Sequence, residues 1–466
     1  MNIVWFRYDL RLEDNHALYY ASKSNDEVLP LFIIDDNVLA LGQCSLLWLY
    51  YSLLDLNKMC NNKLMVIKGK PNQVIDTLIT KYDIKSIFYN KVYEPQYITQ
   101  DNQLELYFQN KYNNRIRFYN YNSSLLFEPN EIKNKIGNGY SVFTPFYKCC
   151  LDSVDKIKPP LPQESINYVS NLDIVQDLSI FASLVNSSWG ANIVKNWSIG
   201  SSHAILKLDN FLAHHISDYK VGRDIPSLNS VSRLSPHIHF GEISVDRIWH
   251  RIKNQINTNS NYEHFFREIC WREFSYNILF YNHKLPLENI NHKFDKFRWS
   301  NNLELYHKWT KGITGIPIVD AGMRELWQTG YMHNRIRMIV GSFLVKNLLI
   351  DWRLGAKWFY DCLFDANLAS NSASWQWVSG CGVDAAPYFR IFNPILQGQK
   401  FDANGIYIKK YVPELSNISD QYLFSPWLAP TQELQKANIK LGVSYPYPII
   451  DLAKSRILAL EIYKSL

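Results

Sequence analysis

Residues that could do redox chemistry gather between positions 365 and 394. Residues 365–377 read Asp-Ala-Asn-Leu-Ala-Ser-Asn-Ser-Ala-Ser-Trp-Gln-Trp, and residues 384–394 read Asp-Ala-Ala-Pro-Tyr-Phe-Arg-Ile-Phe-Asn-Pro. A planar redox cofactor needs hydrogen-bonding groups at its edge and aromatic neighbours that can pass electrons. Carboxylate, amide and small polar residues beside two tryptophans are unusual in a core helix. We therefore expect a loop-like stretch at 365–377 that binds such a cofactor.

A second candidate site lies at residues 219–237. Ser235 precedes Pro236, which is typical of a helix N-cap followed by proline at the first helical position. Exposed amides at such a helix end could bind a pyrophosphate together with Ser232, Arg233 and Ser235. An ordinary helix cap would produce the same pattern, so both interpretations stay open.

A basic and aromatic segment follows at residues 265–274. Glu268 and Arg272 stand four residues apart, and an ion pair on one helix face would explain that spacing. Alternatively, the arginine could contact a phosphate while Trp271 stacks on a base. Arg335 and Arg337 could extend this basic surface.

Other common chemistries have no motif in this chain. The close histidine pairs, 214–215 and 237/239, have neither the i, i+4 spacing nor the cysteine partners of metal sites. No GxSxG or GxxxxGK[ST] motif occurs, which argues against hydrolase and P-loop functions. We expect no bound metal.

The composition is that of a soluble protein of two or three domains. The net charge of +6 permits binding to a polyanion, and the aromatic share of 15% could serve stacking or electron transfer. Seven cysteines without a CxxC pair indicate reduced thiols. No signal peptide or membrane-spanning run is present. We expect a cytoplasmic, monomeric protein that does not bind membranes.

The hydrophobic pattern predicts two different architectures in sequence. Short apolar runs at 3–6, 28–34, 64–67, 86–89 and 115–119 alternate with helical patterns such as 45–60 and 71–82. This alternation predicts a doubly wound, parallel five-stranded α/β domain at 1–125. Its first turn, residues 7–11, is charged and lacks the glycines of a dinucleotide-binding loop.

The remaining chain is predicted to be a connector and a helical domain. Proline- and asparagine-rich residues 126–195 indicate the connector. Helical periodicity, for example at 318–329 and 334–349, predicts an all-α domain at 196–466. Pro317 and Gly330 fit the start and the end of one of its helices.

Taken together, these motifs resemble those of the photolyase/cryptochrome family, in particular its class I cyclobutane pyrimidine dimer photolyases. The opening residues 5–15 (Trp-Phe-Arg-Tyr-Asp-Leu-Arg-Leu-Glu-Asp-Asn) are similar to the family's N-terminal signature. Residues 143–146 (Phe-Thr-Pro-Phe), 315–394 and 397–401 continue the similarity across the whole chain. The resemblance implies an α/β antenna domain, a connector and an all-α domain that binds one FAD.

The resemblance also implies a role for particular residues at the flavin. Asn371 falls where repair enzymes place an asparagine beside flavin N5. Trp375, Trp352 and Trp299 match a chain of tryptophans that carries electrons to the flavin, although core packing would also account for each. The positions implied to bind FAD are Tyr219, Val231, Ser232, Arg233, Leu234, Ser235, Phe265, Arg337, Asp365, Ala366, Asn367 and Asn371.

By the same resemblance, UV-damaged DNA is the partner, and a flipped-out pyrimidine dimer is split by an electron from excited, reduced FAD. Trp271 and Trp377 would pack against the dimer, Glu268 would bond a pyrimidine edge, and three arginines would hold phosphates. The positions implied to bind DNA or the lesion are Arg223, Glu268, Ile269, Cys270, Trp271, Arg272, Glu273, Phe274, Ser275, Asn334, Arg335, Met338 and Trp377.

The chain departs from the family pattern at four positions. Val231, Asn367 and Phe265 replace a threonine, an aspartate and a tryptophan in the flavin pocket. Tyr97 stands where folate-binding relatives have a glutamate that bonds the pterin. This argues against a folate antenna and leaves another second chromophore or none.

Three alternatives to dimer repair remain open. The chain could be a cryptochrome-like photosensor, although Asn371 and the absence of a C-terminal extension weigh against that function. It could repair (6-4) photoproducts, but those relatives have histidines at the positions of Asn334 and Met338. It could also be a flavoprotein that binds DNA without repairing it.

Overall fold

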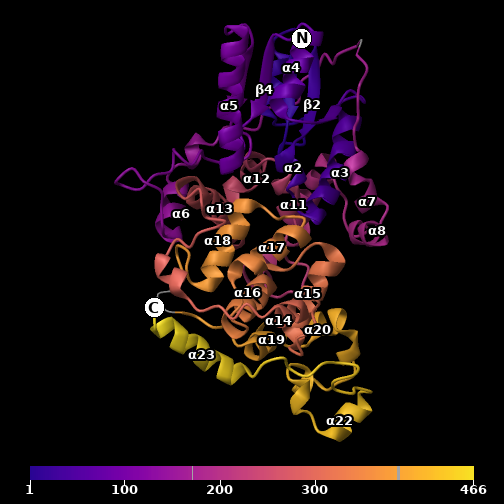
Figure 1. The fold of residues 1–466 in the computed structure, drawn as a ribbon, viewed down its shortest axis with the longest axis vertical. Coiled ribbons are helices and arrows are strands. Elements are labelled where there is room, and N and C mark those ends of the chain that lie inside the picture. Colours follow the sequence, from indigo (N-terminus) through magenta and orange to yellow (C-terminus); the bar gives the residue numbers. More distant parts are fainter. Residues whose placement is uncertain (171, 386–388) are drawn as a thin grey trace. The chain divides into compact units, whose positions relative to one another are not determined.

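The computed structural model describes residues 1–170, 172–385 and 389–466. The chain forms two compact units that are not collinear with the sequence (Figure 1). The first unit comprises Met1–His214, Ser232–His283 and Phe364–Asn367, and the second comprises His215–Val231, Lys284–Leu363 and Leu368–Leu466. The domain limits at 125 and 195 stay a prediction.

The first unit contains a parallel sheet of five strands in the order β3-β2-β1-β4-β5. Each predicted strand is present with its ends shifted by at most two residues, so the predicted α/β architecture is confirmed. Strands β1, β2 and β4 are buried throughout, as expected for sheet interiors covered on both faces. The strand bounds are β1 Asn2–Phe6, β2 Val28–Ile34, β3 Met65–Lys68, β4 Ser86–Asn90 and β5 Arg117–Tyr121.

Helices cover the two faces of this sheet because successive strand residues point in opposite directions. Ile3 and Trp5 share an apolar core with Ile75 of α4 (Pro71–Lys81) and Phe108 of α5 (Pro95–Tyr112). Helix α1 (His16–Ser22) contacts β1 and β4 with its buried residues Ala17, Leu18 and Ala21.

The charged turn after β1 forms buried ion pairs and hydrogen bonds. Arg7 Nη1 lies 2.7 Å from Asp101 Oδ1, and Asn90 Nδ2 donates to Asp9 Oδ2 over 2.6 Å. Arg11 Nη1 donates over 2.9 Å to the carbonyl of Gly241, which follows helix α11 (Ser235–His239). The turn therefore fixes α11 against the sheet within this unit.

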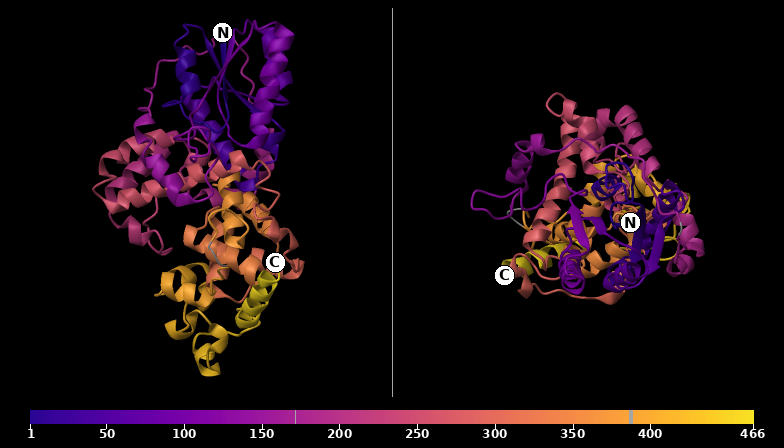
Figure 2. Two further views of the ribbon diagram at one scale, coloured as in Figure 1. Left: turned by 90° about the vertical axis from the view of Figure 1, so that its left-hand side faces the viewer. Right: turned by 90° about the horizontal axis from the view of Figure 1, so that it is seen from above.

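Further helices complete the first unit around α13 (Ser260–Tyr281), its longest helix. They are α3 Gln43–Met59, α6 Phe143–Leu151, α9 Ser201–His214 and α12 Val245–Ile252. Figure 2 shows the segment between β5 and α6 as a projecting loop.

The second unit is helical, as predicted for the C-terminal part of the chain. Pro317 begins α15, and Gly330 ends it with φ +66° in the left-handed region. Helix α16 ends at Ser342 and continues as one π-helical segment, Phe343–Asn347. Its helices include α10 Tyr219–Gly222, α14 Leu303–Thr310, α15 Pro317–Thr329, α16 Asn334–Ser342, α17 Trp352–Cys362, α18 Leu368–Ser379, α19 Pro394–Phe401 and α23 Leu452–Lys464.

The expectation of a loop at 365–377 was wrong for most of that stretch. Residues 368–379 form α18, and only Asp365–Asn367 lie outside the helix. Small side chains at Ala369 and Ser372 are buried, which lets neighbouring elements pack close to α18. A helix rich in small polar residues was mistaken for a loop because its apolar periodicity is weak.

Among the described residues, no helix is long and apolar enough to cross a membrane. The seven cysteines are free thiols. No group of three or more metal-ligating side chains occurs within the described part of the chain.

Candidate functional site

The segment before α11 has the geometry of an anion-binding turn. Arg233 has φ +51°, an uncommon value for a residue with a side chain, and the backbone of Leu234 has the right-handed helical conformation. Successive residues of opposite hand turn neighbouring amides toward one point, forming a concavity that suits a phosphate. The Ser232 hydroxyl accepts a hydrogen bond from the Leu234 amide at 3.4 Å.

Ser235 is not the N-cap that the sequence predicted. It is the first residue of α11, the cap position is Leu234, and no side chain caps the helix. The Ser235 hydroxyl instead donates to Asp365 Oδ2 over 2.6 Å. Two predicted flavin residues that are 130 positions apart are therefore in direct contact.

Three further predicted flavin residues are buried in the first unit, two of them directly after Asp365 in the chain. Asn367 Nδ2 donates to the Tyr276 hydroxyl over 2.6 Å, and burial raises the pKa of Tyr276 to about 12. Ala366 is buried, as is Phe265, whose ring centroid lies 4.9 Å from that of Phe211.

His239 is a candidate site residue that the sequence analysis missed. It stands four residues after Ser235 on α11, and its ring centroid lies 5.2 Å from that of Tyr8. The side chain is 6% exposed, and neither ring nitrogen has a hydrogen-bond partner. Burial lowers the pKa of His239 to about 4, with Asp365 as the nearest opposing charge, so the imidazole is neutral at pH 7. The HxH spacing pointed to this residue only as a possible metal ligand.

Helix α13 presents only part of the predicted DNA-binding run. Glu268, Trp271 and Arg272 are half-buried, whereas the other five side chains are buried in the unit. A helix has one accessible face, so eight consecutive residues cannot all contact DNA directly. The buried side chains, which support this face from beneath, are Ile269, Cys270, Glu273, Phe274 and Ser275.

Trp271 has a fixed orientation because it stacks on Phe143 of α6. The two ring centroids are 3.6 Å apart and the planes differ by 4°. The guanidinium of Arg267 lies 5.0 Å from the Phe143 ring centroid. The motif residues 143–146 therefore support a predicted lesion contact.

Arg272 pairs with Glu273 rather than with Glu268. Arg272 Nη1 lies 2.9 Å from Glu273 Oε1, and Glu273 Oε2 accepts the Leu126 amide over 2.9 Å. Burial raises the pKa of Glu273 to about 7 despite these partners. The carboxylate thus links the start of the predicted connector to α13.

In the second unit, α16 presents three predicted DNA-binding residues on one accessible side. Asn334 is exposed, Arg335 and Met338 are half-buried, and the intervening Ile336 is buried. Arg335 Nη2 lies 2.7 Å from Asp224 Oδ1, and Nη1 lies 3.7 Å from the Met338 sulfur.

Four other predicted residues belong to the second unit. Arg337 lies on α16, Tyr219 begins α10, and Arg223 and Val231 follow α10 in the chain. Arg337 Nε donates to the carbonyl of Met332 over 2.7 Å. The Arg223 guanidinium lies 5.8 Å from the ring centroid of the buried Tyr219, and Val231 is half-buried. Their roles at a flavin or at DNA stay predictions.

The three predicted relay tryptophans differ in burial. Trp375 and Trp352 are buried, and Trp299 is half-buried. The Trp375 ring centroid lies 4.9 Å from that of Phe359 and 6.3 Å from that of Trp309. On α18, one turn before Trp375, Asn371 Nδ2 donates to the carbonyl of Ala356 over 2.9 Å, which fixes the orientation of its amide.

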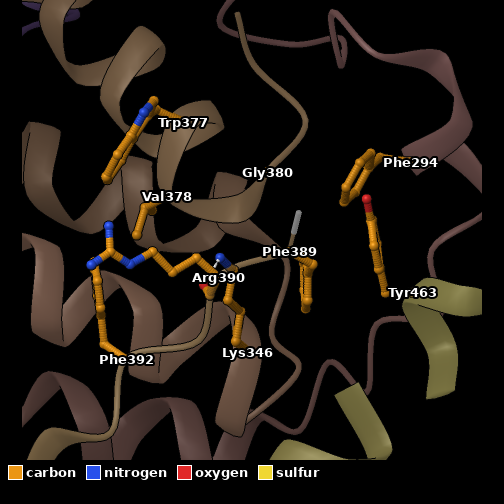
Figure 3. A pocket seen from close by; sticks show the side chains of 9 residues that line it. All are labelled: Phe294, Lys346, Trp377, Val378, Gly380, Phe389, Arg390, Phe392 and Tyr463. Atoms are coloured by element: carbon orange, nitrogen blue, oxygen red, sulfur yellow. Dashed lines mark hydrogen bonds between the residues drawn. The ribbon is translucent and has the colours of Figure 1, made fainter. Parts of the chain in front are cut away.

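Trp377 lines a small pocket in the second unit (Figure 3). Lys346 Nζ donates to the carbonyl of Arg390 at the pocket wall, and burial lowers the pKa of Lys346 to about 7, with Arg390 adding to the shift. Residues 386–388 of the 384–394 motif lie outside the described residues. The remaining lining residues are Phe294, Val378, Gly380, Phe389, Phe392 and Tyr463.

The residues present fit a bound FAD. The Arg233 turn offers amides to a phosphate, Ser235 and Asp365 offer polar atoms, and His239 keeps two buried nitrogens without partners. Buried polar atoms without partners are uncommon in folded proteins and mark places where a ligand or water supplies the missing bond.

Comparison with known proteins identifies the family. Residues 2–165 match the family described as DNA photolyase, and residues 265–465 match the FAD binding domain of DNA photolyase. A deoxyribodipyrimidine photo-lyase of Agrobacterium fabrum is 40% identical over 99% of this chain and 97% of its own length. Cryptochrome-1 of Arabidopsis thaliana is 36% identical over 98% of this chain and 69% of its own length.

Solved structures agree with this assignment. A bacterial class III photolyase from Agrobacterium tumefaciens superposes with a TM-score of 0.95 at 40% identity, covering 100% of this chain and 97% of that one. A cryptochrome from Synechocystis gives 0.90 at 28% identity and covers 99% of both chains. The relative with 0.95 is described as class III, whereas the sequence resemblance suggested class I. The chain belongs to the photolyase/cryptochrome family and contains that family's FAD-binding domain.

Proposed function

We propose that this protein is a light-dependent DNA repair lyase that splits cyclobutane pyrimidine dimers. The accessible side of α16 carries this proposal, because it presents Asn334, Arg335 and Met338 together. The resemblance associates Asn334 and Met338 with dimer repair, and relatives repairing (6-4) photoproducts have histidines there. The full-length similarity to proteins named deoxyribodipyrimidine photo-lyase supports the same activity. We place the protein with class III, following the description of the 40% identical structure.

A bound, reduced FAD would supply light-driven one-electron chemistry, with no net change in the redox state of the dimer or the cofactor. The chain's own residues bind and orient the partners of that transfer. The Arg233 turn and Ser235 hold the phosphate and sugar portions of the cofactor. Asn371 presents an amide whose orientation is already fixed by Ala356, so the group beside flavin N5 stays neutral.

The residues that the resemblance assigns to the lesion act once it leaves the base stack. Flipping a dimer costs less than flipping an intact pair because the damaged bases already stack and pair poorly. Trp271, held flat by Phe143, offers an aromatic surface, and Glu268 accepts a hydrogen bond from a pyrimidine. Arg335 and Arg223 would bind the flanking phosphates, as the resemblance implies.

The deciding experiment uses a thymine dimer in single-stranded DNA. Purified protein is bound to it, illuminated with blue light under reducing conditions, and the remaining dimer is measured. We expect loss of the dimer in the light and none in the dark. An unchanged dimer content after illumination would contradict the repair function. Asn334→His and Met338→His variants serve as matched tests of the lesion class, and both should lose dimer repair.

A second candidate, a cryptochrome-like photosensor, is favoured by the 36% identity to cryptochrome-1 of Arabidopsis thaliana. The same experiment separates the two functions. A photosensor would bind FAD and respond to blue light without removing the dimer.

We further propose a cavity in the first unit as the site of a second chromophore. It lies at the carboxyl ends of β1 and β2, where parallel sheets usually bind ligands. Arg7, Tyr8, Asp35 and Tyr97 line it with several apolar side chains. An aromatic and cationic lining without the folate-binding glutamate suits a planar ring system other than folate. Chromophore extraction from the purified protein, followed by absorption spectroscopy, tests this.

A further inference from the structure

The loop between β5 and α6 has an apolar tip with positive charges beside it. Ile136 is 80% exposed, a larger fraction than for any other large hydrophobic side chain among the described residues. Lys133 and Lys135 are also exposed, and within the described residues neither forms an ion pair. A single exposed isoleucine is ordinary, but one held at a projecting loop tip directly after two exposed lysines is not.

Asn134 closes this loop from inside. Its backbone amide donates to the carbonyl of Asn138 over 2.8 Å, and the Gly137 amide donates to the carbonyl of Asn134 over 2.9 Å. The Asn134 side-chain oxygen accepts the amides of Ile136 and Asn138, each at 3.0 Å, and Nδ2 donates to the carbonyl of Gly139 over 3.0 Å. The tip is therefore a rigid turn rather than a free strand of chain.

Helix α13 holds both ends of the loop. Asn277, 1% exposed, donates to the carbonyl of Ile132 over 3.2 Å and accepts the Tyr140 amide over 3.1 Å. Gly139 packs so closely on Tyr281 that an added Cβ would lie 2.3 Å from that ring. Trp271 is six residues before Asn277, which corresponds to about 9 Å along the helix axis. The loop is thus anchored to the helix that carries the predicted lesion contacts.

We propose that this tip is a wedge for duplex DNA beside the lesion, with Ile136 inserted at a base step and Lys133 and Lys135 on the flanking phosphates. This inference rests on the proposed repair function. Proteins that bend or open DNA often insert isoleucine or a similar apolar side chain between base steps, and cations nearby hold the backbone. Opening the duplex at a dimer is the step that such a wedge would favour. Single-stranded DNA has no base pairs to open, so the tip acts on duplex substrate alone.

The test compares wild-type holoprotein with Ile136→Asn on the same thymine dimer in single-stranded and in duplex DNA. We expect the substitution to weaken duplex binding about tenfold, since it removes the burial of one apolar side chain. Binding and repair of the single-stranded dimer should be unchanged. Leu206→Asn, which alters another exposed apolar residue of the same unit, is the matched control. It should change the binding of neither the single-stranded nor the duplex substrate.

Two further measurements report on the wedge without using repair. A 2-aminopurine placed opposite the dimer should brighten less on binding Ile136→Asn than on binding wild type, because the base stays stacked. Lys133→Gln/Lys135→Gln should reduce the slope of log affinity against log salt by about 2 for the duplex.

The possible results separate the two proposals. Equal duplex affinity and equal 2-aminopurine signals for wild type and Ile136→Asn would overturn the wedge. So would an equal loss of affinity for single-stranded and duplex DNA. Absence of repair of the single-stranded dimer by wild-type protein would instead reject the proposed function.

Discussion

Gly355 of α17 offers a sharp test of how the Trp375 ring is positioned. A Cβ added at Gly355 would lie 2.2 Å from Trp375 Cη2, 2.5 Å from Cζ3 and 2.6 Å from Leu344 Cδ2. Ordinary carbon contacts begin near 3.5 Å, so Gly355→Ala must displace the indole by about 1 Å or more. Overpacking of this kind costs about 1–3 kcal/mol, and the gain in helix propensity from glycine to alanine offsets about 1 kcal/mol. We expect a net loss of up to about 2 kcal/mol in the free energy of unfolding.

Gly341→Ala is the matched control, because Gly341 is also a helical glycine beside Trp375. Its added Cβ would lie 3.3 Å from Val378 Cγ1 and 3.7 Å from Trp375 Cζ3, which requires only a small adjustment. Urea unfolding measures both variants. The rate of photoreduction of the oxidised flavin under a thiol reductant then reports on the position of the Trp375 indole. This rate should be lower in Gly355→Ala but unchanged in Gly341→Ala. If Gly355→Ala unfolded and photoreduced like wild type, the inferred packing around Trp375 would be wrong.

Three further predictions follow from the site. Trp375→Phe should abolish photoreduction yet spare repair by chemically reduced enzyme, and surviving photoreduction would remove Trp375 from the relay. Arg272→Ala should weaken lesion binding and flatten its salt dependence, but it should also destabilise the fold by about 1–3 kcal/mol because it removes a hydrogen-bond partner of the buried Glu273. Adding Glu273→Gln should recover part of the stability in urea unfolding, and no recovery would contradict this explanation. The pKa of His239 is lowered to about 4 by burial, against about 6.5 when unfolded, so the unfolded chain binds more protons between these values. The free energy of unfolding of the apoprotein should therefore fall by about 3 kcal/mol as the pH drops from 6.5 to 4. The variant His239→Gln should lose this pH dependence. The control variant His307→Gln, which alters an exposed histidine, should keep it.

Much of the fold could be read from the sequence because local patterns determine it. Buried parallel strands are short continuous apolar runs, and those at β2 and β4 were predicted to within one residue of their observed ends. Proline at the start and glycine at the end placed α15 in the same way. Helix α18 escaped this reasoning, since small polar residues mask the period that marks a helix.

The candidate site likewise has one part that the residue types revealed and one part that only the folded chain shows. The short stretch from Asp365 to Trp377 could be singled out from its residue types alone, because carboxylate, amide and tryptophan rarely gather so closely without a function. Contacts between distant segments could not be predicted from residue types. Ser235 meets Asp365 across 130 residues, and Phe143 stacks on Trp271 across 128 positions of chain.

The sequence by itself therefore determined most element types, with α18 as an exception, as well as the parallel sheet and the family. Tertiary structure alone decided which side chains of α13 remain accessible, which partner Arg272 takes, and that His239 is buried, neutral and without hydrogen-bond partners. The reason is physical. Element type depends on neighbours within a few residues, whereas burial, pKa and ring stacking depend on groups brought together only when the chain has folded.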